Sequence, residues 1–336
     1  MRTNKAFEIL LVLFIILLII PSAALSGNES YKTLFQPLPD RVDNPENPLN
    51  RDKILLGKML FIDARLSKSG FFSCNSCHNL TTGGVDNLPT SIGHAWHSGP
   101  RNAPTVYNAA IHTTQFWDGR AKDVEEQAQG PVLNPGEMAS SKELVLERIN
   151  TIPEYVSLFK KAFPESKDPI TYENVAKAIA AFERTLMTPS RFDRYLKGDK
   201  KALTSDEMKG LNIVVKKGCV ACHRGPALGG NSFQKFDYGD DMGRYEVTKN
   251  EADRKVFKVA SWRNVALTYP YFHDGKVWNL DEAVRIMGEK QLNTKLTDEE
   301  VHYIVIFLNS LTGEMKRIDL PVLPPSTQNT PHPDRN

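Results

Sequence analysis

Two short segments of the chain combine cysteine and histidine at a spacing that suits covalent attachment of a porphyrin. Residues 74–78 read Cys-Asn-Ser-Cys-His, and residues 219–223 read Cys-Val-Ala-Cys-His. Each thiol of such a box can add to one vinyl group, and the histidine that follows can bind the iron axially. Zinc ribbons and redox dithiols also use Cys-x-x-Cys pairs, but neither requires a histidine directly after each pair. The doubled box uses all four cysteines of the chain and predicts two covalently bound haem c groups, attached at Cys74, Cys77, Cys219 and Cys222, with His78 and His223 as iron ligands.

The second axial ligand of each iron decides the chemistry, because a haem with an open or displaceable site can bind a small molecule. In the second half the candidate is Met287, which shares one face of a short expected helix with Leu280 and Val284. Gly288 is expected to end that helix. A methionine on such a stripe usually fills a core, and Met242, in a loop rich in glycine and aspartate, is a rival ligand. Thioether ligation raises the reduction potential, so the second haem is expected to be the high-potential one.

In the first half the candidates for this ligand are His94, His97 and His112. His94 lies in a segment dense in glycine and proline, residues 79–104, and loops of that length are usually functional. A lone histidine in a loop is more often simply solvated. A loop is also where a displaceable ligand must sit, since a hinge can move it off the iron. Ligation by two histidines would hold this haem at low potential.

Two irons of separated potential suit a two-electron reduction, such as that of hydrogen peroxide to water. A one-electron donor would then replenish each haem in turn. Glu137, in a loop with Pro135 and Gly136, could move the peroxide proton as a general acid and base, although an isolated glutamate is more often plain surface. Trp117 could couple the two haems electronically, with ordinary core packing as the alternative.

The N-terminus has the pattern of a secretory signal. Arg2 and Lys5 precede an apolar run at residues 9–20, and small residues follow up to Ser26. The run is short for a span of about 20 residues, so cleavage near Ser26 is favoured over an uncleaved anchor. Because covalent haem attachment occurs outside the bacterial cytoplasm, we expect a periplasmic protein. The 42 basic and 40 acidic residues nearly cancel, so no nucleic-acid partner is indicated.

Helical patterns dominate the chain and strand alternation is weak, so the expected class is all-α. A helix is expected to begin near Asn50, and the clearest helix of the first half spans Thr171 to Leu186. Capping boxes at Thr204 and Thr297 open two more helices, the second of which is expected to stop at Gly313. Weaker helical signals cover residues 123–129 and 141–149.

Several features occur twice in the same order. Each half has a haem box, an Arg-Asn pair (101–102 and 263–264), an aromatic-Asp-Gly-basic turn (115–120 and 271–276) and a closing aromatic-rich helix. Chance could produce each similarity alone, but the shared order predicts two cytochrome c-like haem domains related by an internal repeat, with long irregular loops. We therefore expect a signal peptide (1–26), an N-terminal haem domain (27–187), a C-terminal haem domain (188–316) and a proline-rich tail, docked or loose (317–336).

These segments resemble the bacterial dihaem cytochrome c peroxidases from about Leu56 to Gly313. Beyond the two haem boxes, the resemblance is carried by residues 93–96, 99–105, 115–120, 263–268, 270–275 and 284–288. It implies that His78 and His94 ligate the peroxidatic haem, and that His223 and Met287 ligate the electron-transferring haem. In that family, reduction of the high-potential haem releases the distal histidine and opens the peroxide site.

The resemblance also implies roles outside the iron ligands. Glu137 is similar to the family's catalytic acid and base, and Trp117 to the residue between the haems. Calcium is expected between the domains, on the side chain of Asn102 and the carbonyls of Thr268 and Pro270, since Ca²⁺ prefers hard oxygen ligands. The expected electron donor is a small periplasmic cytochrome c or a cupredoxin, and the expected assembly is a homodimer.

Two other functions stay open at this point. A non-catalytic dihaem electron carrier would also have two haem boxes, but it would not need Glu137, Trp117 or the loop that carries His94. A MauG-like dihaem oxidase acts on a partner protein and has tyrosine in place of the distal methionine. Met287 fits the peroxidase pattern and counts against this second alternative.

Overall fold

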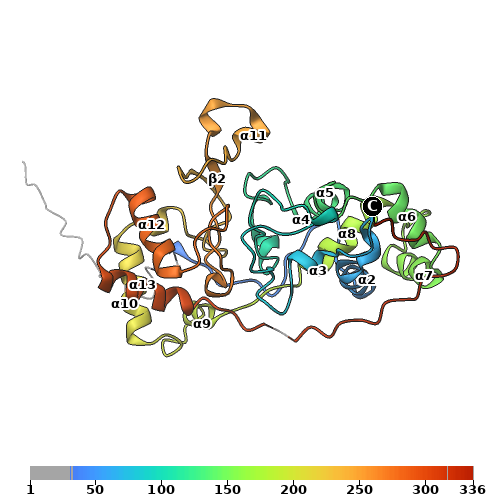
Figure 1. The fold of residues 1–336 in the computed structure, drawn as a ribbon. Helices are drawn as coiled ribbons and strands as arrows, with labels where there is room; N and C mark the ends of the chain where they lie inside the picture. The colour runs from blue at the N-terminus through green and yellow to red at the C-terminus, as the bar shows by residue number, and fades with distance from the viewer. Residues whose placement is uncertain (1–30, 32, 316, 336) are drawn as a thin grey trace, which may run out of the picture.

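The computed structural model describes residue 31, residues 33–315 and residues 317–335 (Figure 1). The predicted signal peptide, 1–26, lies outside these residues. The described part is helical, with one two-stranded antiparallel sheet in which Phe233 pairs with Lys258. The expected all-α class is confirmed apart from this small hairpin. Among the described residues, no helix is both long and apolar enough to cross a bilayer.

The regular elements are mostly short. In the first half they are α2 (Arg51–Ile62), η1 (Ala64–Leu66), α3 (Cys74–Cys77), η2 (His94–Trp96), η3 (Ala109–Ile111), α4 (Val124–Gln127), α5 (Gln129–Leu133), α6 (Lys142–Asn150), α7 (Pro153–Ala162) and α8 (Tyr172–Glu183). In the second half they are α9 (Arg191–Leu196), α10 (Ser205–Lys216), η4 (Cys219–Ala221), β1 (Phe233–Lys235), α11 (Tyr245–Thr248), η5 (Glu251–Asp253), β2 (Val256–Lys258), η6 (Val265–Leu267), α12 (Leu280–Leu292) and α13 (Asp298–Asn309).

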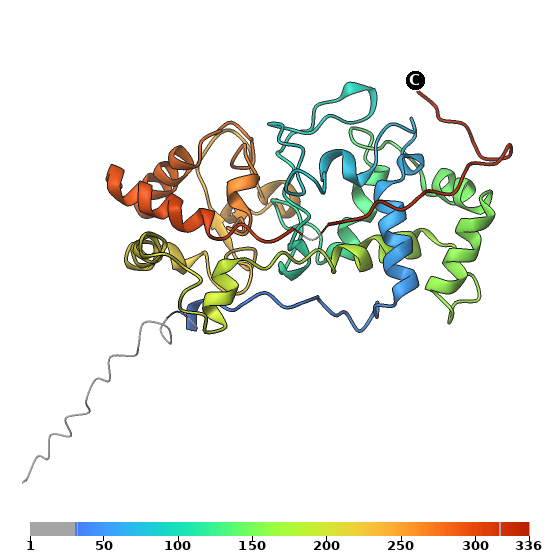
Figure 2. The same cartoon turned by 90° about the horizontal axis from the view of Figure 1, so that it is seen from below.

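The helices form two lobes, each around its own hydrophobic cluster (Figures 1 and 2). One lobe is built on the pair α2 and α8, with α7 beside it, and the other on the pair α10 and α13, with α12 beside it. Both pairs cross at a glycine. A side chain at Gly57 would collide with the backbone of Ala178, and one at Gly210 with the backbone of Tyr303. Both lobes therefore bring their long helices to backbone contact in the same way.

The two ends of the described chain cross to the opposite lobe. Tyr31 and Phe35 are buried in the cluster of the α10–α13 lobe, although the chain then continues into the α2–α8 lobe. At the other end the tail leaves α13 and runs along the α2–α8 lobe (Figure 2). There the Arg148 guanidinium donates hydrogen bonds to the carbonyls of Pro331 and His332. The tail is therefore docked, which is one of the two expected alternatives.

Some backbone features occur in both halves, but in a different register from part of the sequence match. Asn108 and Asn264 are both left-handed residues that precede a 3₁₀ turn. Both side-chain amides donate to the hydroxyl of the buried Thr188, at 2.8 and 2.9 Å. The predicted equivalence of Asn102 with Asn264 is therefore wrong, because Asn108 holds the matching position. The Arg-Asn pairs at 101–102 and 263–264 are identical in sequence but do not hold equivalent positions. The aromatic turns do match, because Phe116 and Phe272 are both left-handed.

The helix starts are predicted better than the helix ends. Asn50 caps α2, and the capping boxes at Thr204 and Thr297 are present. Gly288 does not end its helix: α12 continues to Leu292, and Gly288 is buried against Leu296. Gly313 is not a helix stop either. α13 ends before it, at Asn309, and Gly313 lies where a side chain would collide with the backbone of Thr188.

Candidate haem sites and the cavity between the lobes

The first Cys-x-x-Cys-His box forms the single turn α3, opened by a capping box between Ser73 and Ser76. Both thiols are half-buried and unbridged. Burial raises the pKa of Cys77 to about 11 and raises that of Cys74 further, so both sulfurs are neutral. Two neutral thiols on one helical turn, with a histidine at its end, fit thioether attachment of a haem.

The imidazole of His78 follows directly. Burial lowers its pKa, an effect that the Asp86 charge and backbone groups of Pro104 and Gly84 oppose in part. Its Nδ1 atom is buried and accepts no bond from the described residues. A neutral imidazole is the form that binds a metal, so His78 fits the role of an iron ligand.

The second box follows α10, which ends at Lys216, and it begins directly after Gly218, which is left-handed with φ 84°. His223 stacks on Trp262, with ring centroids 4.2 Å apart. Its Nδ1 lies 3.2 Å from the Leu228 carbonyl oxygen and donates to it as an N–H. Burial lowers the pKa of His223 to about 4. The imidazole is therefore neutral and oriented, with Nε2 left for iron, as is typical of metal-binding histidines.

The candidate distal histidine of the first half sits on a tight loop. The Gly93 N–H donates to the His97 carbonyl at 2.8 Å, and an isolated bridge joins Ile92 to Ser98. Inside this loop Ala95 and Trp96 are both left-handed, at φ 52° and 61°. This conformation costs roughly 1–2 kcal/mol for each residue with a Cβ. The loop buries the His94 side chain and leaves the indole of Trp96 80% exposed.

The predicted acid and base lies against this loop. The His94 N–H donates to the Glu137 carbonyl at 2.8 Å, and a side chain at Gly93 would collide with the backbone of Gly136 and Glu137. The Asn134 amide donates to the Glu137 carboxylate at 2.7 Å. Burial raises the pKa of Glu137, while Asn134 and the charge of Arg120 oppose the rise.

The Glu137 carboxylate also lies near enough to the first haem box for its charge to add to the raised pKa of both thiols there. The structure thus brings together three residues that lie 20 to 63 positions apart in the sequence: Cys74, His94 and Glu137. The other histidines of that half lie elsewhere. His97 packs on Gly136, and His112 contacts Lys258 of the other lobe.

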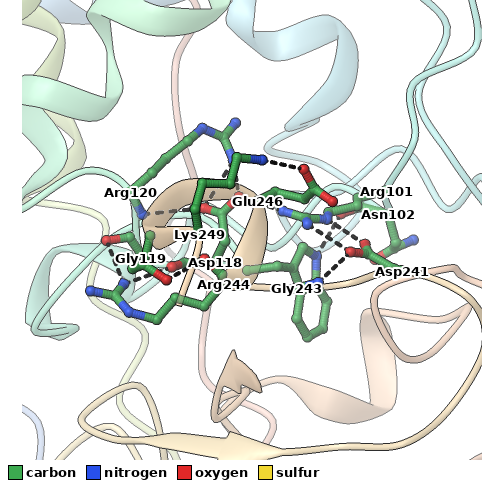
Figure 3. Close-up of polar contacts among 12 residues, drawn as sticks. Arg101, Asn102, Asp118, Gly119, Arg120, Asp241, Gly243, Arg244, Glu246 and Lys249 are labelled. Carbon is green, nitrogen blue, oxygen red and sulfur yellow. Dashed lines mark hydrogen bonds and ion pairs between the residues drawn. The ribbon is translucent and has the colours of Figure 1, made fainter. Parts of the chain in front are cut away.

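Trp117 lies at the junction of the lobes. Its indole N–H donates to the Asn102 carbonyl at 2.9 Å, and its ring meets that of His273 edge to face at 6.3 Å. The neighbouring Asp118 binds the guanidinium of Arg101, which also forms a two-bond pair with Asp241 of the second half (Figure 3). We call Arg101, Asp118 and Asp241 the charged clasp. It ties the turn that carries Trp117 to the segment between β1 and β2, and no local pattern in the sequence indicates it.

The three candidate calcium ligands line one cavity between the lobes. The side-chain amide of Asn102 donates to the Leu88 carbonyl, so its oxygen faces away from that bond. Within the described chain, no donor reaches the carbonyl oxygens of Thr268 and Pro270. Three oxygens without donors fit a hard cation. The described residues contain no cluster of three or more His, Cys, Asp or Glu that could hold a metal, so any cation here would rely on amide and carbonyl oxygens.

The two candidate methionines have different surroundings. Met287 is half-buried on α12, one turn after Val284, which belongs to the same cluster as Cys219 of the second haem box. Met242 lies beyond β1, where its sulfur contacts the guanidinium of Arg254. The pocket around Met242 is lined mainly by charged side chains, those of Lys235, Asp237, Asp240, Arg254 and Lys255.

Comparison with known proteins identifies the family of the chain. The model of the family described as di-haem cytochrome c peroxidase matches residues 51–201. A cytochrome c551 peroxidase of Pseudomonas aeruginosa is 49% identical over 318 residues, which cover 91% of this chain and 92% of that protein. The chain belongs to the dihaem cytochrome c peroxidase family.

Two further relatives of this dihaem peroxidase family member extend the comparison. A cytochrome c551 peroxidase of Nitrosomonas europaea is 53% identical over 292 residues, covering 84% of this chain and 87% of that protein. The crystal structure of a MauG-like protein associated with microbial copper homeostasis superposes with a TM-score of 0.76 at 30% identity, over 82% of this chain and 94% of that chain. Membership of the family implies haem c as cofactor, and the two donor sets described above fit it.

Proposed function

We propose that this chain is a dihaem cytochrome c peroxidase that reduces hydrogen peroxide to water. The observation that carries the proposal is the contact of the His94 loop with Glu137 beside the first haem box. A pure electron carrier needs neither a buried carboxyl nor a histidine on a loop at its haem. A peroxidase needs both, one to move a proton and one to vacate the iron.

Each lobe holds one haem in this proposal. His78 and His94 ligate the haem at Cys74 and Cys77, and His223 and Met287 ligate the haem at Cys219 and Cys222. The proposed domains are 27–187 and 188–316, with the ends of the chain exchanged between the lobes. The charged surroundings of Met242 support Met287 as the thioether ligand.

The protein's own groups supply the proton steps. When bound, the two haems supply the two electrons that the O–O bond requires. Glu137 would take a proton from one peroxide oxygen and return it to the other, which would leave as water. Its partial burial suits this exchange, because burial raises the pKa of the carboxyl and so makes the protonated form easier to reach. Two further protons from solvent complete two waters.

Access to the first iron is proposed to depend on the His94 loop. Two consecutive left-handed residues make its closed form costly, so the closed form lasts only while other contacts hold it. The bond from His94 to iron would be one such contact. Once that bond were released, as reduction of the second haem would allow, the His94 loop could relax and give peroxide access.

Further parts of the proposal concern the setting of the enzyme. We propose export to the periplasm by the segment 1–26, a calcium ion on Asn102, Thr268 and Pro270, and a homodimer. The proposed electron donor is a small cytochrome c or a cupredoxin. Trp117 is proposed to couple the two haems, since it lies at the junction of the lobes.

The direct test is peroxide-dependent oxidation of a reduced small cytochrome c or cupredoxin by the purified haem-loaded protein. Turnover at two donor molecules per peroxide supports the proposal, and its absence with both haems attached would leave the electron carrier. Oxidation of a partner protein in place of the donor would indicate the MauG-like alternative. Replacing Met287 by alanine should sharply lower one haem potential, whereas Met242→Ala, the matched control, should not. The reverse pattern would make Met242 the ligand.

A further inference from the structure

The cavity between the lobes contains a buried cation without an anion. Lys258, the last residue of β2, is 8% exposed and lines the cavity. Its ammonium nitrogen lies 3.1 Å from Nδ1 of His112, which comes from the other lobe. Among the described residues, no carboxylate lies within ion-pair distance of Lys258. The carboxylate whose charge acts on the pKa of Lys258 is that of Asp118. A buried ammonium is normally paired, so the expected partner is missing from the protein itself.

The hydrogen bonds of Lys258 and His112 leave N–H groups that need an acceptor. Burial lowers the pKa of Lys258 to about 8, so it is mostly an ammonium at neutral pH and donates to Nδ1 of His112. His112 must then carry its proton on Nε2, and burial together with Lys258 keeps its pKa well below the usual value. The Nε2 atom is buried and has no partner in the described chain. The pair thus presents N–H donors from both side chains and holds no acceptor of its own for them, which suits a carboxylate.

The position of the pair relates it to both haem sites. Pro104 and Ala260 line the same cavity. Backbone groups of Pro104 lie close enough to His78 to influence its pKa, and those of Ala260 do the same for His223. The cavity therefore adjoins the histidine ligands of both boxes.

The surrounding chain also holds the pair in place. The backbone N–H of Lys258 donates to the Trp117 carbonyl at 2.8 Å, which fixes the backbone position from which the lysine side chain extends. The imidazole of His112 packs on Gly230 so closely that any side chain at Gly230 would collide with it. Both donors are thus positioned in advance, as a binding site for a fixed group requires.

We propose that Lys258 and His112 bind the carboxylate of a haem propionate in this cavity. The inference rests on the proposed attachment of haem at the two boxes. The positive charge of Lys258 then compensates the propionate and disfavours the ferric state of the adjacent iron, which raises its reduction potential. Lys258 is a positioning residue that acts through the propionate. A free carboxylate or other small anion offers the same chemistry, and the test separates the two sources.

The test is a potentiometric titration of the haem-loaded wild type, Lys258→Met, Lys258→Arg and His112→Phe. In Lys258→Met we expect the ferrous-to-ferric ratio of one haem, at fixed ambient potential, to fall at least tenfold, which corresponds to about 59 mV for one electron. Lys258→Arg keeps the charge and should stay near wild type. His112→Phe removes one donor and should shift the same haem in the same direction by less. Resonance Raman should show a shifted propionate bending band in Lys258→Met.

Several results would overturn the inference. One is an unchanged potential for both haems together with an unchanged propionate band in Lys258→Met. If that variant does not fold, unchanged values in His112→Phe decide in the same way. Wild-type potentials that vary with added acetate or chloride would assign the cavity to a free anion instead of a propionate. A wild-type protein without covalent haem refutes the proposed function itself, and the haem content is measured first for that reason.

Discussion

Glu137→Gln is the substitution that tests the proposed proton transfer most cleanly. Glutamine keeps the shape of the side chain and can still accept the 2.7 Å hydrogen bond from Asn134, so the loop should stay in place. What it loses is the ability to take up and return a proton. General acid and base catalysis contributes roughly 10²–10⁴ in rate, which corresponds to about 3–5.5 kcal/mol in the barrier. We expect kcat/KM for peroxide to fall by that factor while both haems stay attached and both potentials stay unchanged.

Asn134→Ala provides the companion measurement, because it changes the acidity of Glu137 without removing the carboxyl. The hydrogen bond from Asn134 lowers the pKa of Glu137 against the effect of burial, so its loss should raise that pKa. Since the deprotonated carboxyl accepts the first proton, activity rises with pH through this pKa. The acidic limb of the kcat/KM profile should therefore move to higher pH. A Glu137→Gln enzyme within threefold of wild type, or an unmoved limb in Asn134→Ala, would refute the role of Glu137.

Three further predictions concern the loop, the core and a second buried carboxyl. Ala95→Gly removes the cost of one left-handed residue, which is about 0.5–1 kcal/mol after allowing for the added freedom of glycine. Loss of the distal ligand on half-reduction, followed by stopped-flow absorbance, should therefore be two- to fivefold slower than in the wild type. Faster loss would contradict the proposal that backbone strain helps to open the loop. Asp193→Asn breaks the buried two-bond pair with Arg263 and should cost about 3–5 kcal/mol in denaturant unfolding, whereas Glu251→Gln, in an exposed pair, should change nothing measurable. Burial and the charge of Glu125 raise the pKa of Glu183 to about 8, above its unfolded value, so its contribution to stability is present at low pH and is lost as pH rises through 8. The melting temperature of Glu183→Gln should fall less than that of wild type between about pH 6 and pH 9, and parallel curves would contradict this.

Features encoded within a few residues were predictable. A haem box needs only the spacing of two cysteines and a histidine, and a capping box such as that at Thr204 needs only residues one helical turn apart. Both are local, so tertiary structure did not alter them. The prediction that two glycines end helices is wrong for the opposite reason. Gly288 and Gly313 are required by contacts with Leu296 and Thr188, which no local pattern reveals.

The same distinction applies to the site. Glu137 and His94 were singled out as candidates, but their contact depends on two loops that pack through glycines at 93 and 136. The charged clasp and the Lys258–His112 pair join residues more than 100 positions apart, so the sequence offered no signal for either. The sequence match also pairs Asn102 with Asn264, whereas in the structure Asn108 is the residue that makes the same hydrogen bond to Thr188 as Asn264.

The central claim is that a displaceable His94 opens a peroxide site at the first haem. The measurement that tests it most directly is absorbance and EPR spectroscopy of the haem-loaded protein, fully oxidised and then half-reduced, followed by rapid mixing with peroxide. We expect half-reduction to convert one haem from six- to five-coordinate, after which peroxide should oxidise the protein rapidly. In His94→Gly that haem should lack the histidine ligand before any reduction. Two haems that stay six-coordinate on half-reduction and do not react with peroxide would contradict it.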